Sequence, residues 1–547
     1  MAAPGRGEGG AGGGLKASLA RLAFRLPIYR RTLDGRVPAS LSSTPDWLLP
    51  GEAAIADRLF QGRWRLAGDE LADARHAPFD LPPPSRAFAV ELHCFGWLRH
   101  FAASGGAAAR RQARALVGHW LARYGEFEPA LWAPELLAPR LARWIGHAGF
   151  LLADSDDAFR AAFLRGLVRQ SRHLRRSLGQ IGDEATRFQA GLALALAALV
   201  LGGSRQDGAR GLELVEAALA RLLLPDGCHA SRRADELLVL LAEILTLRQA
   251  LEQAGREVPL AIGSAIERAA PALRFLRHGD GSLALFNGTR PWPAPAIDQV
   301  LARTGSRARA ERNLPDGGYE RLQAGRSLLL LDAGRPALAS APAHAGLLSI
   351  EFSIGRRRVI VNCGASERRE GDWAGAMRAS AAHSTLVLAD QNSLVLDAQG
   401  CPADDIAEIV HARAETEEHL MVEATHGGYA ARFGLSHRRR LWLGRNGEDL
   451  YGEDALIGPG RGAPGFAIRF HLHPDVQVSL LQDGQSALLR LSASHGLRFR
   501  AANAALSLEE SVYFGDPGRI ARTRQLVLTG SAEEAAAPVT WHIGRMQ

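Results

Sequence analysis

Residues 344–390 read HAGLLSIEFSIGRRRVIVNCGASERREGDWAGAMRASAAHSTLVLAD, and this stretch decides the fold class of the 547-residue chain. Leu347 to Phe352 and Arg358 to Asn362 are short runs rich in β-branched and large apolar residues, and a glycine separates them. Such runs are typical of an antiparallel hairpin. The chain then passes Arg378 and returns through His383, so we expect both side chains around the mouth of the next strand.

The patterns on the two sides of this stretch differ. From Phe88 to about Leu273, apolar residues recur at helical spacing, as at Val117, Trp120 and Leu121. From Tyr319 onward, short apolar runs punctuated by Gly, Asp and Pro continue to the end of the chain, and this pattern favours an antiparallel β-sandwich. The sequence therefore predicts an α+β multidomain protein, with a helical half followed by a stranded half.

A chain of this length exceeds one ordinary hydrophobic core, so we expect at least two domains. We assign residues 1–26 to a flexible Gly-rich tail, 27–310 to the helical domain and 311–547 to the β-sandwich domain. Residues 277–318 are rich in Gly, Pro and Arg and form the candidate linker. A groove between two such domains is the expected binding site.

The net charge is +7, and almost all the cations are arginine. Codon bias in a GC-rich genome explains this abundance, and so does bidentate recognition of carboxylate or sulfate groups on an acidic polymer. Composition leaves both explanations open. The arginines are dispersed through both halves and are not gathered with aromatic residues on one stripe, so we expect no nucleic-acid partner.

The four cysteines form no C-x-x-C pair, which argues against a zinc ribbon or a redox motif and predicts buried thiols. The longest apolar run, around residues 191–201, is too short to span a membrane and indicates a buried helix. The N-terminal residues lack a continuous apolar region and a cleavage site, so no signal peptide is evident.

Six segments carry a resemblance to a known family. In the stranded half these are GYERLQAGRSLLLLDAG, AHAGLLSIEFSIGRRRVIVNCG and AAHSTLVL, and in the helical half HCFGWLRHFAA, LLLPDGCHASRRADELLVLLAEILTLRQAL and LRFLRHGDGSLALFNG. These segments resemble the heparinase II/III family of bacterial polysaccharide lyases. The resemblance implies an incomplete (α/α) toroid followed by a β-sandwich. It also implies β-elimination on an acidic, uronate-containing polysaccharide, at the cell envelope or in the periplasm. The missing signal peptide leaves a cytoplasmic location open.

β-Elimination needs a group that neutralises the uronate carboxylate, a base and an acid. In PDGCHASRR, His229 and Arg232 stand at the entrance of a helix, where free amides favour an anion. We expect His229 as a base and Arg187 or Arg232 as the neutralising group, with Arg187, Arg233 and Arg378 binding substrate. The alternative is that Ser231 caps the helix and the arginines are solvated.

The chain departs from the family pattern in the helical half. Well-characterised members carry a tyrosine slightly beyond the DG turn, whereas ASRRADELLVLL has none. Tyr429 is the best remaining phenol for a general acid, and His383 joins the predicted catalytic set; the alternative for Tyr429 is an ordinary strand aromatic. Either other residues do the work, or the elimination activity is altered or lost.

His383 also matches a histidine that binds zinc in some members. We predict Asp404 and His437 as its partner ligands, since neutral imidazole and carboxylate suit zinc. The alternative is a hydrogen-bonded structural histidine. The leading prediction is thus a lyase acting on an acidic polysaccharide. The rival is a non-catalytic protein that binds an anionic glycan or maintains the cell envelope through a degenerate lyase site.

Overall fold

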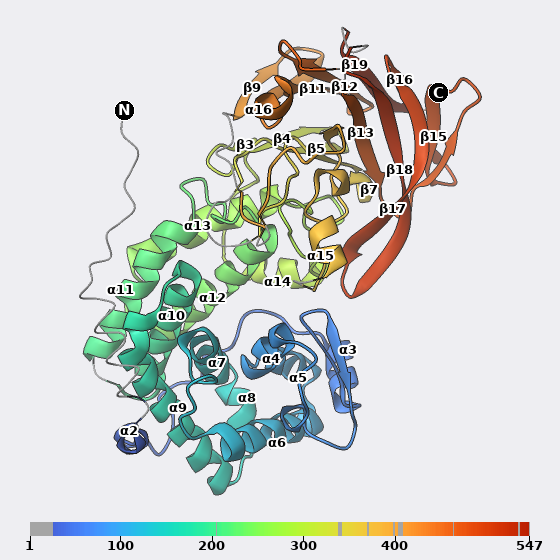
Figure 1. The fold of residues 1–547 in the computed structure, drawn as a ribbon. Coiled ribbons are helices and arrows are strands. Elements are labelled where there is room, and N and C mark those ends of the chain that lie inside the picture. The colour runs from blue at the N-terminus through green and yellow to red at the C-terminus, as the bar shows by residue number, and fades with distance from the viewer. Residues whose placement is uncertain are drawn as a thin grey trace. The chain divides into compact units, whose positions relative to one another are not determined.

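The computed structural model describes residues 24, 26–203, 205–336, 342–368, 371–397, 400–402, 409–462, 464–533 and 537–545. The chain forms two compact units, each described by itself: unit 1 comprises residues 1–222 and 242–264, and unit 2 comprises residues 223–241 and 265–547. Most helices, blue to green in Figure 1, precede the strands of the two large sheets, which are yellow-green to red. The predicted 1–26 tail lies almost wholly outside the described residues.

Unit 1 is helical. Its helices up to the first unit boundary are α2 (Pro27–Thr32), α3 (Ala53–Phe60), α4 (Arg86–His93), α5 (Leu98–Ser104), α6 (Gly106–Tyr124), α7 (Pro134–Gly146), α8 (Ala148–Leu152), α9 (Asp157–Ser177), α10 (Glu184–Val200) and α11 (Arg205–Leu222). Asp156 and Asp183 cap α9 and α10 by accepting a backbone N–H in the first turn. The strands β1 (Arg63–Leu66) and β2 (Asp69–Ala72) form a short antiparallel hairpin.

Helix α10 contains the longest apolar run and is the centre of unit 1. It packs against α7, α9 and α11. A Cβ at Gly191 would lie 2.8 Å from the Gly211 carbonyl oxygen, so the glycines of α10 and α11 permit close contact between the two helices. Among the described residues, no helix combines the length and apolar character needed to cross a membrane. The prediction of a buried helix is confirmed, since Leu192, Leu194 and Leu196 are buried.

Two helices, α12 (Ala234–Gln253) and α13 (Leu260–Phe275), contribute residues to both units, and α14 (Ala294–Arg303) belongs to unit 2. The predicted linker 277–318 therefore lies within unit 2. Leu283, Leu285 and Phe286 are buried there. Gly and Pro in this segment make turns around packed side chains, which is why its composition resembles that of a linker.

Unit 2 contains two antiparallel sheets. One has the order β14-β15-β16-β19-β12-β11-β10-β9, and the other has β17-β18-β13-β7-β6-β5-β4-β3, with β8 paired to β13. The strands are β3 (Asn313–Leu314), β4 (Tyr319–Ala324), β5 (Ser327–Asp332), β6 (Ile350–Ile354), β7 (Arg357–Val361), β8 (Leu386–Leu388), β9 (Ile409–Glu415), β10 (His419–His426), β11 (Ser436–Gly444), β12 (Asp449–Ile457), β13 (Gly465–Leu472), β14 (Gln477–Leu480), β15 (Ser486–Ser492), β16 (His495–Ala502), β17 (Ala505–Asp516), β18 (Arg519–Ser531) and β19 (Val539–Arg545).

The hairpin predicted from residues 344–390 is confirmed as β6 and β7, which pair antiparallel around Gly355 at φ 58°. One buried apolar cluster joins both sheets, with Phe352 and Ile360 from one and Leu441 and Trp541 from the other. Alternation places these side chains on the inner faces, as in a β-sandwich.

Three of the four cysteines, Cys94, Cys228 and Cys363, are free and buried, which confirms the prediction for them. Cys401 is exposed, so the prediction of a buried thiol is wrong there. It follows a turn at Gly400 outside the named strands, and sequence spacing carried no information about that position.

Candidate functional site

His229 lies in the turn between α11 and α12, where it forms a β-bridge with Leu223. Its Nδ1 lies 2.6 Å from Ser231 Oγ, accepts the Ser231 backbone N–H at 3.1 Å and lies 3.5 Å from Glu236 Oε2. Burial lowers the pKa of His229 below its usual value. The imidazole is thus neutral and engaged by its own turn. Its predicted role as base stays a prediction.

Arg232 is buried and uses its guanidinium within unit 2. It donates to the carbonyl oxygens of Gly317 at 2.7 Å and Gly334 at 3.1 Å, and it forms an ion pair with Asp332. The same group lies over the Tyr319 ring, 4.8 Å from its centroid. Arg232 is therefore not the solvated or groove-facing side chain that its sequence position indicated, because burial is compensated by a carboxylate and carbonyls.

Arg233 and Arg187 are also paired. Arg233 contacts Asp235 at 2.6 Å and Glu236 at 2.8 Å. Arg187 contacts Glu184 at 2.6 Å, one turn away on α10. Their predicted roles in substrate binding stay predictions, and a substrate carboxylate would compete with these acids. At the entrance of α12, Ser231 Oγ accepts the Arg233 N–H at 3.4 Å, and Thr289 Oγ1 accepts the N–H of Ala234, the first residue of the helix, at 3.0 Å.

The clearest juxtaposition of imidazoles is that of His344 and His383. His344 Nδ1 lies 3.3 Å from His383 Nε2, and the rings meet at 78°. His383 is 1% exposed, and its Nδ1 has no hydrogen-bond partner among the described residues. Burial lowers the pKa of His383 to about 4 and holds that of His344 well below its usual value. Both rings are therefore neutral near pH 7.

Glycines pack directly against this imidazole pair. A Cβ at Gly288 would lie 2.7 Å from His344 Nε2, and one at Gly346 would lie 2.9 Å from His383 Nδ1. Larger residues at these positions would displace the rings. Two segments that are far apart in sequence therefore pack against the histidine pair.

Arg378 lies close enough to His344 for its charge to contribute to the lowered pKa of that imidazole. Its side chain is half-buried. Within the part of the chain that the structure describes, its guanidinium forms no hydrogen bond or ion pair. A partly desolvated guanidinium with free N–H groups is suited to bidentate recognition of a carboxylate. Of the predicted substrate-binding arginines, Arg378 alone has this character among the described contacts.

Tyr429 is fully buried. Its hydroxyl donates to the backbone carbonyl oxygens of Leu386 at 3.0 Å and Gln391 at 3.4 Å. Burial raises the pKa of Tyr429 above its usual value. The phenol is thus part of the sandwich core and lies just before the short helix α16 (Ala430–Phe433), rather than in a strand. The role of general acid stays a prediction that the surroundings do not favour.

The zinc ligand set cannot be assembled from the described residues. Asp404 lies outside them. His437 Nε2 contacts Asp454 Oδ1 at 2.7 Å, and Arg439 and Trp541 bind the same carboxylate. No group of three His, Cys, Asp or Glu side chains able to hold a metal is found among the described residues. The described donors do not fit a zinc centre, and zinc stays a prediction.

Sequence reasoning missed His344 and Glu351. Glu351 is buried and contacts His278 Nε2 at 2.7 Å, and it accepts the N–H groups of Leu285 and Asn362. His278 therefore has a structural role, because it is held by the buried Glu351 carboxylate. His344 stands at the start of the stretch quoted above, but its pairing with a histidine 39 residues later has no signal in spacing.

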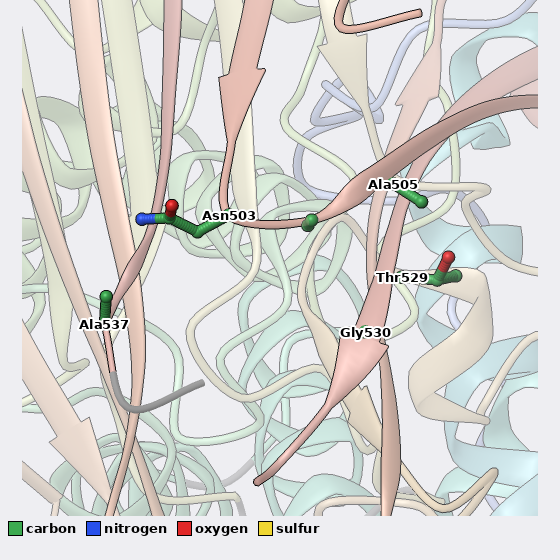
Figure 2. Close-up of a pocket in the computed structure, with 6 residues that line it drawn as sticks. Asn503, Ala505, Thr529, Gly530 and Ala537 are labelled. Carbon is green, nitrogen blue, oxygen red and sulfur yellow. The ribbon is translucent and has the colours of Figure 1, made fainter. Parts of the chain in front are cut away.

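A cavity of about 610 Å³ lies at the starts and ends of strands of the sandwich and is lined by Asn503, Ala504, Ala505, Thr529, Gly530 and Ala537. Figure 2 shows these residues. None of these side chains titrates near neutral pH or is a strong nucleophile. This cavity therefore offers no acid–base chemistry.

Comparison with known proteins identifies the fold and the relatives. The family model described as "Heparinase II/III-like, C-terminal" matches residues 306–542. FtsZ-localized protein C of Caulobacter vibrioides (strain NA1000 / CB15N) is 32% identical over 539 residues, covering 93% of this chain and 91% of the relative.

Solved lyase structures share the fold. A crystal structure of heparinase III has a TM-score of 0.68 at 15% identity and covers 97% of this chain and 84% of its own. Heparan sulfate lyase HepC from Pedobacter heparinus has a TM-score of 0.60 at 15% identity, with 98% and 88% covered. The predicted architecture, an incomplete (α/α) toroid followed by an antiparallel β-sandwich, is confirmed.

Proposed function

Because this chain belongs to the heparinase II/III-like family, we propose that it binds an acidic, uronate-containing polysaccharide through Arg378 and His344, without cleaving the polymer. The observation that carries the proposal is the contrast between Arg378, whose guanidinium has no partner among the described residues, and the fully engaged side chains of Arg232 and Tyr429.

Recognition follows from the chemistry of the first two groups. The Arg378 fork matches the two oxygens of a uronate carboxylate. His344 is neutral, and because its Nδ1 contacts His383, its Nε2 is the nitrogen left for a sugar hydroxyl. His383 holds His344 by the 3.3 Å contact and acts as a positioning residue.

Elimination has weaker support. A general acid must reach the leaving oxygen, and the Tyr429 hydroxyl is buried and donates to backbone carbonyls. The N–H groups of Arg232 already donate to Asp332 and to backbone carbonyl oxygens. The helical half also lacks the tyrosine beyond the DG turn. These features favour a degenerate site that keeps recognition and has lost turnover.

Binding is tested with the full chain against alginate, polygalacturonate, hyaluronan, chondroitin sulfate and heparan sulfate, with dextran as the neutral control. Affinity electrophoresis should show retardation by at least one acidic polymer and none by dextran. Arg378→Gln should weaken that binding about tenfold, as expected for loss of one charge-assisted pair. Arg490→Gln, which changes an exposed arginine on β15, should leave it unchanged. Equal binding by Arg378→Gln and wild type would refute the proposed site.

A second candidate is a lyase that uses His383 as base. The observation that favours it is the unpartnered His383 Nδ1 on an imidazole whose pKa lies at about 4, so the ring is unprotonated near pH 7. In this case the ultraviolet absorbance of an unsaturated product would rise with one polymer in the panel. His383→Gln would abolish the rise, and Tyr429→Phe would leave it intact.

The location also enters as a proposal. The Caulobacter relative is named for localisation with FtsZ, and we propose that this chain likewise localises with FtsZ and serves the envelope there. A fluorescent fusion imaged together with FtsZ tests this. Coincident bands support it, and diffuse or evenly peripheral fluorescence contradicts it.

A further inference from the structure

A second cluster of charged residues lies in unit 2, and it includes neither His344 nor His383. A cavity of about 590 Å³ opens beside the turn that follows α13, the β4–β5 hairpin and the β6–β7 turn. Five arginines line it: Arg274, Arg277, Arg321, Arg326 and Arg356. Only two carboxylates, Asp280 and Asp298, share the lining.

Both carboxylates are already paired. Asp298 Oδ1 lies 2.8 Å from Arg277, and Asp280 Oδ2 lies 3.2 Å from Arg358 Nε. Asp280 also accepts hydrogen bonds from the backbone and hydroxyl of Ser282. Neither acid is therefore free to neutralise the remaining arginines of the cavity.

Two of those arginines are partly buried and bind only uncharged acceptors. Arg321 donates to the Phe275 carbonyl oxygen at 2.7 Å and to Gln323 Oε1 at 2.9 Å. Arg274 donates to the carbonyl oxygens of Ser306 at 2.6 Å and Ala308 at 2.9 Å. Burial lowers the pKa of Arg321 to about 10, since no carboxylate offsets the lost hydration.

The other two, Arg326 and Arg356, are exposed at the rim. Among the described residues, neither guanidinium forms an ion pair. A Cβ at Gly355 would lie 2.7 Å from Arg326 Nη2, so the guanidinium rests against the glycine of the β6–β7 turn. Among the described residues, the cavity thus combines two partly buried, hydrogen-bonded guanidinium groups with two exposed ones, and none of the four pairs with a carboxylate.

We propose that this arginine pocket binds a small molecule bearing a tetrahedral dianion, as a phosphate or sulfate ester. Planar guanidinium forks bind such oxyanions through paired N–H···O contacts. The volume is that of a small-molecule site. The fixed pair, Arg274 and Arg321, supplies a positive field, and the rim pair, Arg326 and Arg356, closes on the anion. This site is separate from the proposed polysaccharide contact at Arg378 and does not depend on it.

The test uses the full chain and three probes: inorganic pyrophosphate, glucose 6-phosphate and glucose 6-sulfate. Isothermal titration should give saturable binding of at least one probe, weaker at higher salt. The Arg326→Gln/Arg356→Gln double variant should bind that probe about tenfold more weakly or worse. The matched control is Arg490→Gln/Arg500→Gln, which removes the same charge from exposed arginines outside the cavity and should retain wild-type affinity.

Because all four control and test arginines are exposed, the variants should keep the wild-type circular dichroism spectrum and melting temperature. A preference for one glucose ester identifies the anion. The proposal is overturned if no probe binds saturably, or if the control pair loses as much affinity as the test pair. Polysaccharide retardation should be unchanged in the test pair, so the two sites can fail separately.

Discussion

His344 Nδ1 lies 3.3 Å from His383 Nε2, and this contact joins the two ends of the stretch that decides the fold. His344 precedes β6 and His383 precedes β8, so the hairpin β6–β7 and the return of the chain bring them together. Both imidazoles are buried, so a positive charge on either ring would be costly. The pair is therefore neutral, and its geometry depends on that neutrality.

Mild acid should destabilise the protein through His383. Its pKa is about 4 in the folded chain and about 6.5 when unfolded, so the unfolded state binds more protons between these values. Stability is fully present above pH 6.5 and is lost as the pH falls toward 4. The expected loss from this group between pH 7 and pH 5 is about 2 kcal/mol.

Urea unfolding at pH 7 and pH 5, followed by circular dichroism, measures this loss. His383→Gln should show a loss smaller by about that 2 kcal/mol, because the variant has no proton to take up at this position. His495→Gln, an exposed histidine on β16, is the control and should keep the wild-type dependence. The same slope in all three proteins would contradict the assignment.

Glu243 should act in the opposite direction. It is buried on α12, accepts from Gln189 Nε2 at 2.7 Å, and burial raises its pKa to about 7. Since the unfolded pKa is about 4.3, the folded state holds the extra proton, and stability falls as the pH rises through 7. Among the described residues, Oε1 of Glu243 and Oε1 of Gln189 both lack a hydrogen-bond partner.

Glu243→Gln should therefore remove a loss of about 2 kcal/mol between pH 5 and pH 8. Melting temperatures across that range give the comparison with wild type. Glu216→Gln, an exposed position on α11, should leave the wild-type pH profile unchanged. If Glu243→Gln melts in parallel with wild type at every pH, the carboxyl does not hold its proton.

The Arg232–Asp332 ion pair should be one of the costliest to break. Asp332→Ala leaves a buried guanidinium without its carboxylate, and loss of one partner of a buried pair costs about 3–5 kcal/mol. Glu448→Gln is the matched control, because its pair with Arg545 at 2.8 Å is exposed and should contribute under about 1 kcal/mol. Equal shifts in melting temperature would refute the structural role of Arg232.

Tyr429→Phe should affect stability and spare glycan binding. The hydroxyl donates to the Leu386 carbonyl oxygen within the core, so its removal should cost about 1 kcal/mol. Affinity electrophoresis with the best acidic polymer should match wild type. If the variant keeps its stability but the polymer no longer retards it in the gel, Tyr429 takes a direct part in recognition.

Much of the fold was predictable because periodicity reports which faces are buried. The two predicted strand runs, Leu347 to Phe352 and Arg358 to Asn362, are displaced from β6 and β7 by three residues or fewer. Strands with one exposed face, such as β9 with its polar alternation, gave too weak an apolar signal to be recognised. The 277–318 segment was misread because turns that pack against a sheet share the composition of a linker.

The site was less predictable because spacing does not reveal partners. Arg232 stands at a helix entrance in the sequence, but its guanidinium pairs with Asp332, a hundred residues away. The contact between His344 and His383 likewise has no counterpart in the sequence pattern. Arg378 was predicted to bind substrate. Among the described residues, Arg187 and Arg233 form ion pairs and Arg378 does not, and no local sequence pattern encodes this difference.

The most direct measurement is a combined assay of the full chain with the uronate polymer that it binds best. The account predicts saturable binding that Arg378→Gln weakens about tenfold, together with a flat ultraviolet absorbance over many hours at enzyme-like concentrations. A rise in the absorbance of unsaturated product, lost in His383→Gln, would contradict binding without cleavage and establish the lyase.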